Sequence, residues 1–167
     1  TAWLTPETPL SRFVFRGDSA AQAAASAAFG VTLPQEACRA TVQGDRAALW
    51  LGPDEFLLLA TAEAGETISA AIGSALASQP HSLVDVSHRQ VGLVVQGPRA
   101  EWLLESQCPL PLNLRDFPVG MCTRTIFSKA EIVLWRTTEN SFHIEVWRSF
   151  SRYVVQLLHE VARELPA

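Results

Sequence analysis

The sequence contains very little lysine, and its charge is weakly negative overall. Lys129 is the only lysine against twelve arginines, and the formal net charge is −4. A chain without a sequence-wide positive field has no electrostatic means of following a phosphate backbone, so nucleic acid is not expected as a partner. No apolar run approaches the ~20 residues of a membrane-spanning helix, and the first residues do not form a basic segment followed by an apolar one. We therefore expect a cytoplasmic protein that does not enter a membrane.

Motifs for metals, disulfides and nucleotides are missing as well. The three cysteines, Cys38, Cys108 and Cys122, are an odd number without C-x-x-C spacing, which is typical of reduced thiols rather than a disulfide framework or a zinc knuckle. The four histidines are spread over separate predicted elements, so no metal site is expected. Neither G-x-G-x-x-G nor G-x-x-x-x-G-K occurs. The sequence thus predicts no cofactor-binding and no metal-binding residue on this chain.

What is present predicts an α+β fold built from two similar halves. Residues 39–50 align without a gap on residues 124–135 at an offset of 85, which places Trp50 over Trp135. Strand and helix patterns around both segments give the order β-α-β-β-β-α twice, which favours antiparallel sheets with helices on one face. With 48% apolar residues in 167, the chain has ample material for a core. We predict halves at residues 1–80 and 81–167 that together form one compact globular unit.

Local signals mark the ends of several elements. Gly17-Asp18-Ser19 predicts the N-cap of an alanine-rich helix that ends at Gly30. Residues 1–10 carry Trp3 and two prolines without periodicity, which indicates either an extended arm lying across another surface or a frayed terminus.

Two segments of the second half are too apolar for ordinary solvated surface. Residues 107–118 form a proline-punctuated loop with Leu110, Leu112 and Leu114 at alternate positions. These leucines either bind along another chain or cap the end of their own sheet. In residues 142–147, alternation turns Phe142, Ile144 and Val146 inward, leaving His143 and Trp147 on the other side. Tryptophan is enriched at protein interfaces, and the interface candidates are Trp3, Leu110, Leu112, Leu114, Trp135, His143 and Trp147.

The polar segment Asp85-Val86-Ser87-His88 contains the side-chain types of a nucleophilic triad. Neighbours on a strand point to opposite faces, so a contiguous triplet does not stack nucleophile, base and orienting group. A structural role, with Asp85 capping backbone groups of Ser87 or His88, is the favoured interpretation. No catalytic residue is predicted.

The same segment, followed by a strand and Gly97-Pro98, resembles the folate-dependent aminomethyltransferases, the T-protein family of glycine cleavage. Residues 117–136 and 142–147 resemble the gamma subunit of heterotetrameric sarcosine oxidase, and the likeness covers at least residues 83–164. This resemblance implies a T-protein-like fold and a complex of alpha, beta, gamma and delta chains. That complex oxidatively demethylates sarcosine with FAD, FMN, NAD and tetrahydrofolate, and yields glycine, hydrogen peroxide and 5,10-methylenetetrahydrofolate.

Two functions are compatible with these observations. The first is a non-catalytic gamma subunit that packs directly on the alpha chain, in the same complex as beta and delta. The second is a stand-alone folate-binding, aminomethyltransferase-like domain with Asp85 or His88 near the pterin. Binding of tetrahydrofolate by the isolated chain discriminates between them.

Overall fold

The computed structural model describes residues 3–164 and divides the chain into two units. One unit is Pro9–His88, here the first unit. The other, here the second unit, joins the N-terminal segment up to Thr8 to the chain from Arg89 onward. The division falls at His88 rather than at residue 80 because strand β6 (His81–Asp85) pairs with β2 of the first unit.

Each unit is a five-stranded antiparallel sheet with its helices. The first unit contains, besides β6, the elements β2 (Leu10–Gly17), α1 (Ser19–Phe29), β3 (Ala40–Gln43), β4 (Arg46–Gly52), β5 (Glu55–Thr61), η1 (Ala62–Ala64) and α2 (Gly65–Ala75). The second contains β1 (Leu4–Pro6), β7 (Gln90–Gln96), α3 (Ala100–Glu105), β8 (Cys122–Phe127), β9 (Ala130–Thr138), β10 (Ser141–Trp147) and α4 (Arg148–Arg163). Within residues 3–164, no helix combines the length and apolarity needed to cross a membrane.

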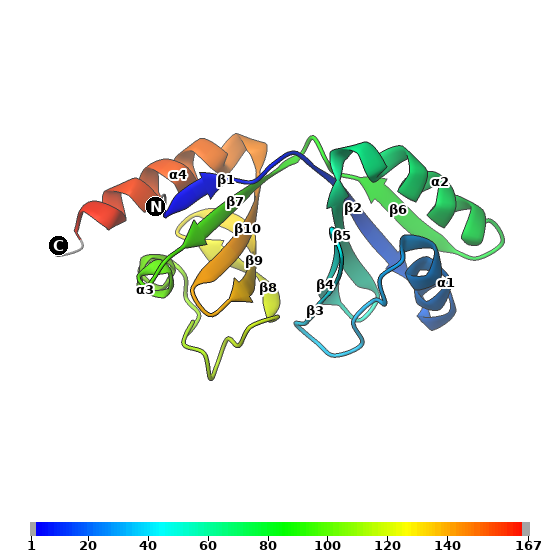
Figure 1. The fold of residues 1–167 in the computed structure, drawn as a ribbon, viewed down its shortest axis with the longest axis horizontal. Helices are drawn as coiled ribbons and strands as arrows, with labels where there is room; N and C mark the ends of the chain where they lie inside the picture. Colours follow the sequence, from blue (N-terminus) through cyan, green and yellow to red (C-terminus); the bar gives the residue numbers. More distant parts are fainter. Residues whose placement is uncertain (1–2, 165–167) are drawn as a thin grey trace. The chain divides into compact units, whose positions relative to one another are not determined.

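The two sheets have the same strand order, which confirms the α+β pseudo-repeat. The order is β6-β2-β5-β4-β3 in the first and β1-β7-β10-β9-β8 in the second. Each sheet has one strand beyond the predicted repeat (Figure 1). β1, from the start of the chain, pairs with β7 in the second unit, and β6, which follows the first repeat, pairs with β2 in the first unit. The N-terminal arm is therefore an edge strand, with Leu4 opposite Val95 and Pro6 opposite Leu93.

Helices and sheet bury a common apolar layer in each unit. In the first unit, Ala21 and Ala25 of α1 and Ile68 and Ile72 of α2 pack with core residues of the strands such as Phe15. Asp18 is the N-cap of α1 and accepts a hydrogen bond from the Ala21 N–H, while Gly30 ends the helix with φ of 80°, as predicted. The small alanine side chains let α1 lie close to the sheet.

The two tryptophans matched by the sequence alignment lie on opposite faces of their sheets. The β3–β4 turn at Gly44-Asp45 corresponds to the β8–β9 turn at Ser128-Lys129. The separation of these two turns along the chain is one residue shorter than the offset of 85 that the sequence alignment predicts. Because strand side chains alternate, a one-residue shift moves a side chain to the other face. Trp50 packs against the core of the first unit, whereas in β9 the core position is taken by Leu134.

Candidate functional site

The three leucines of the loop between α3 and β8 have three different environments. Leu112 is fully buried in the core of the second unit, and Leu110 is partly buried against the same core. Leu114 is 46% exposed. Leu112 therefore stabilises its own unit, and substituting it with Asp would disrupt folding rather than test an interface. Leu114 is the loop leucine that a partner can contact.

A single buried arginine holds this loop in place. The guanidinium of Arg136 on β9 is 1% exposed and donates to the carbonyl oxygens of Leu112 and Phe117, the latter at 2.8 Å. It also donates to the Glu139 carbonyl at 2.8 Å and to Glu101 Oε2 of α3 at 2.8 Å, and lies 4.6 Å from the centroid of the Phe142 ring. Arg136 thus ties α3, the loop and the β9–β10 turn together with charge-assisted hydrogen bonds.

The tip of the loop is ordered by its own asparagine. Asn113 Oδ1 accepts from the backbone N–H groups of Arg115 and Asp116 at 3.1 Å, and the Phe117 N–H donates to the Asn113 carbonyl at 2.8 Å. Such an Asx turn is a local alternative to regular structure. A rigid tip loses little conformational entropy on binding, so its exposed Leu114 is well suited to docking.

A second exposed apolar surface lies where β10 meets α4. Trp147 and Phe150 are each 44% exposed, and the Arg89 guanidinium lies 5.2 Å from the centroid of the Trp147 ring. The Arg148 N–H donates to the Arg89 carbonyl at 2.8 Å, which holds the arginine beside the indole. Exposed Trp and Arg side chains together are typical of interface hot spots. The exposure predicted for Trp147 is observed.

His143 lies on the sheet face opposite the helices but is 4% exposed, so it is not a surface contact. Its Nε2 lies 2.7 Å from Glu145 Oε1, and its Nδ1 lies 3.5 Å from Glu7 Oε2 of the N-terminal arm. The ring also contacts Trp135, which is partly buried, at a centroid distance of 5.8 Å. We call His143, Glu145 and Glu7 the imidazole clamp.

The imidazole clamp shifts the pKa values of two of its members. Burial alone would lower the pKa of His143, but the hydrogen bonds to Glu145 and then Glu7 outweigh it and raise that pKa to about 9. The hydrogen bond with His143 lowers the pKa of Glu7 to about 2, against the opposing effect of burial. At neutral pH the clamp therefore holds an imidazolium between carboxylates and ties the arm to the sheet.

The segment with triad-type residues is a backbone joint. The Ser87 N–H donates to Asp85 Oδ1 at 2.8 Å, and Ser87 Oγ accepts from the Arg12 N–H at 2.9 Å. The hydrogen bonds from Ser87 lower the pKa of Asp85. The favoured prediction, that Asp85 caps a backbone group of Ser87, is confirmed.

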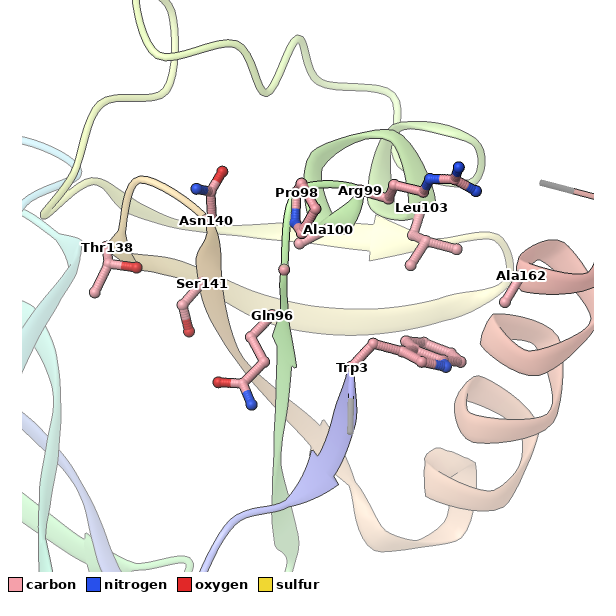
Figure 2. Close-up of a pocket in the computed structure, with 11 residues that line it drawn as sticks. Trp3, Gln96, Pro98, Arg99, Ala100, Leu103, Thr138, Asn140, Ser141 and Ala162 are labelled. Atoms are coloured by element: carbon pink, nitrogen blue, oxygen red, sulfur yellow. The ribbon is translucent and has the colours of Figure 1, made fainter. Parts of the chain in front are cut away.

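A cleft of ≈ 630 Å³ opens in the second unit, between the end of β7, the start of α3 and the β9–β10 turn (Figure 2). Trp3 of the N-terminal arm lines it, and the Trp3 ring makes an edge-to-face contact with His159 of α4 at 5.2 Å. Trp3 is thus partly buried against its own unit.

The sequence interpretation missed Arg136, Glu101 and Glu7. One signal was available for Arg136, because a charged residue at a core-facing position of an apolar strand needs buried partners. The partners themselves come from distant segments, and nothing local in the sequence indicates which carboxylate or carbonyl reaches it.

A solved structure of low sequence identity has the same fold as this chain. The glycine cleavage system aminomethyltransferase T from Bartonella henselae superposes on 96% of this chain and 46% of its own, with a TM-score of 0.72 and 15% identity. At that identity the likeness concerns the fold alone, which is that of the aminomethyltransferases.

The family follows from closer relatives. The sarcosine oxidase, gamma subunit family model matches residues 16–164, and the chain belongs to this family. The sarcosine oxidase subunit gamma of Corynebacterium sp. (strain U-96) is 37% identical over 152 residues, which are 89% of this chain and 72% of the relative. A chain of the heterotetrameric sarcosine oxidase from Corynebacterium sp. U-96, in complex with pyrrole 2-carboxylate, matches 98% of this chain and 85% of its own, at 32% identity and a TM-score of 0.91.

Proposed function

We propose that this chain is the gamma subunit of a heterotetrameric sarcosine oxidase and carries no catalytic residue. The observation behind the proposal is the TM-score of 0.91, at 32% identity, to a chain of such an oxidase. The subunit packs directly on the large alpha chain, in one complex with beta and delta. That complex converts sarcosine to glycine with release of hydrogen peroxide and 5,10-methylenetetrahydrofolate, using FAD, FMN, NAD and tetrahydrofolate held by other chains.

The state of the ionisable groups supports a non-catalytic role. His143 is buried between the carboxylates of Glu145 and Glu7, and each of its ring nitrogens contacts one of them. Ser87 Oγ is occupied by the Arg12 backbone N–H. A general base must reach substrate, and the buried His143 is not placed to do so.

The docking surface of the subunit is the loop tip at Leu114. Val119, at the other end of the same loop, is 48% exposed, so the loop offers two apolar side chains on a pre-ordered backbone. Binding would remove this apolar surface from water without the cost of ordering the loop.

Substitution of one exposed residue tests this proposal in the assembled complex. With all four chains co-expressed and this chain tagged, Leu114→Asp is expected to reduce recovery of the other chains at least about tenfold, because a buried unpaired carboxylate opposes docking. Val42→Asp is the matched control, since Val42 is 56% exposed on β3 of the first unit. Full recovery with Leu114→Asp, or equal loss with both variants, would overturn the assignment to the loop.

Titration of the isolated chain with tetrahydrofolate is a second test, which compares the subunit role with the stand-alone folate-binding domain. The subunit role predicts no saturable binding at micromolar concentration. Saturable binding that is lost on substitution of Asp85 would instead support the stand-alone folate-binding domain.

A further inference from the structure

Strand β6 is an edge of the first unit's sheet, and within residues 3–164 it pairs with β2 alone (Figure 1). Four of its five residues are exposed, among them Val84 at 50%. The strand contains no lysine, arginine or proline, and its pairing with β2 has no bulge. Such features are the means by which soluble proteins keep an edge strand from pairing with another chain. β6 is therefore open to a further strand.

The other three sheet edges in the described part of the chain are better protected. β1 has three residues and ends in Pro6, which has no N–H to donate. β8 contacts the loop after α3, because Cys108 Sγ lies 3.6 Å from Thr125 Oγ1. β3 contacts the segment after α1, because Thr41 Oγ1 donates to the Thr32 carbonyl. β6 is thus the edge strand that is neither shortened by proline nor contacted by a neighbouring loop in this way.

The direction of the backbone groups along β6 follows from its pairing with β2. The Val86 N–H donates to the Arg12 carbonyl at 2.8 Å, and the register continues without a shift as far as His81. Hydrogen bonds alternate along an antiparallel pair, so the even-numbered residues of β6 bond to β2. The N–H and C=O groups of His81, Leu83 and Asp85 therefore point to the open edge.

A second copy of the same strand matches these outward groups. A two-fold axis at the central residue, Leu83, overlaps all five residues of two antiparallel copies of β6. It pairs odd-numbered residues with odd-numbered residues, so that outward N–H and C=O groups meet each other. Leu83 then lies opposite its own copy, and Asp85 lies opposite His81 rather than opposite another carboxylate. The strand is therefore complementary to itself in backbone, side chains and charge.

We propose that β6 is a self-association surface, through which two copies of the chain join their first-unit sheets by antiparallel pairing about Leu83. In this register the two exposed Val84 side chains are diagonal neighbours on one face. Only five residues of each copy take part, so the dimer is weak, with a dissociation constant on the order of 100 µM. Because β6 belongs to the first unit and the docking loop to the second, the proposal does not rest on the subunit role.

Sedimentation equilibrium of the full chain between about 10 µM and 1 mM tests the dimer. The native chain is expected to change from monomer to dimer across this range. Val84→Lys should weaken association at least about tenfold, because it places two positive charges close together and adds the charge that guards natural edge strands. Val42→Lys is the matched control, since Val42 is 56% exposed on the edge strand β3. Unchanged thermal unfolding of both variants establishes that they fold.

A cysteine at position 83 tests the register. Opposite residues of a hydrogen-bonded antiparallel pair have Cα atoms about 5.5 Å apart, which is within the range of a disulfide. In a Cys38→Ser background, Leu83→Cys is expected to form a disulfide-linked dimer when glutathione disulfide oxidises the two thiols. Ser82→Cys, which does not lie opposite its own copy, should link at least about tenfold more slowly. The remaining native cysteines, Cys108 and Cys122, are buried.

Three results would overturn the proposal. The first is a native chain that stays monomeric up to about 1 mM, which would leave the edge to a different partner or to solvent. The second is a dimer that Val84→Lys does not weaken, or that Val42→Lys weakens equally. The third is cross-linking at position 82 that is as fast as at position 83.

Discussion

Replacing Arg136 by Met removes the group that holds the loop of the second unit. The guanidinium donates to three backbone carbonyls and to Glu101, and Met cannot replace any of these hydrogen bonds. Each buried carbonyl left without a donor costs about 1–3 kcal/mol. Glu101 is 38% exposed, so water can solvate its carboxylate and reduce its share of the loss. We therefore expect Arg136→Met to lower the free energy of unfolding by about 3–5 kcal/mol, chiefly from the buried carbonyls that lose their donor.

Arg115→Met is the matched control on the same loop. The Arg115 side chain is 86% exposed, and its ion pair with Asp116 spans adjacent residues. An exposed pair contributes little to stability, so this variant should unfold close to the native chain. The comparison separates the loss of a buried anchor from the loss of a positive charge.

Urea unfolding and amide hydrogen exchange measure the two consequences. The urea midpoint should be lower in Arg136→Met than in the native chain and unchanged in Arg115→Met. Exchange should accelerate at the Phe117 N–H in Arg136→Met, because its hydrogen bond to the Asn113 carbonyl depends on the anchored loop. A loss below about 1 kcal/mol, or unchanged exchange in the loop, would refute the role given to Arg136.

Two other predictions concern the imidazole clamp and the glycines of α2. Folding raises the pKa of His143 from 6.5 to about 9, so its contribution to the free energy of unfolding should be complete below pH 6.5 and be lost as the pH rises through 9. Folding lowers the pKa of Glu7 from 4.5 to about 2, so its contribution to the free energy of unfolding should be complete above pH 4.5 and be lost as the pH falls through 2. The urea midpoint should therefore be highest near pH 4.5–6.5, and Glu7→Gln should lower it there; a flat profile for the native chain contradicts the clamp. Gly65→Ala should destabilise the first unit by about 1–3 kcal/mol, because the new Cβ would lie 2.5 Å from Ser11 Oγ. Gly73→Ala meets no atom within 4 Å and should stabilise α2 by about 0.5–1 kcal/mol. Thermal unfolding that ranks the two variants in the opposite order contradicts this packing.

Local chemistry made part of the fold predictable. The N-cap at Asp18 and the C-cap at Gly30 depend on residues within one helical turn, so the sequence is enough to place α1. The α+β repeat was predictable because strand and helix periodicities recur in both halves.

Non-local pairing accounts for what the sequence did not reveal. β6 follows the first repeat directly but pairs with β2, and β1 pairs with residues of β7 that lie 87 to 91 positions further along the chain. Sequence alignment also placed Trp135 one residue out of register with Trp50, since matching of residue types ignores which face of a strand each occupies. Register depends on the turns. The turns at Gly44 and Ser128 are one residue closer together along the chain than Trp50 and Trp135 are.

The candidate site was predictable only in outline. The apolar loop and Trp147 stood out by composition, but alternation along the loop did not reveal that Leu112 points into the core and Leu114 away from it. That difference arises from the turn at Asn113 and from Arg136, whose carbonyl acceptors have no sequence signature.

Native mass spectrometry of the tagged chain, recovered at moderate salt from its host, shows whether the chain is a subunit of an oxidase. We expect one assembly that contains this chain with three other chains, of which one is much larger. We also expect a yellow preparation, because the complex is proposed to carry flavin. A colourless chain recovered alone, or only with copies of itself, would contradict the proposal that it is an oxidase subunit.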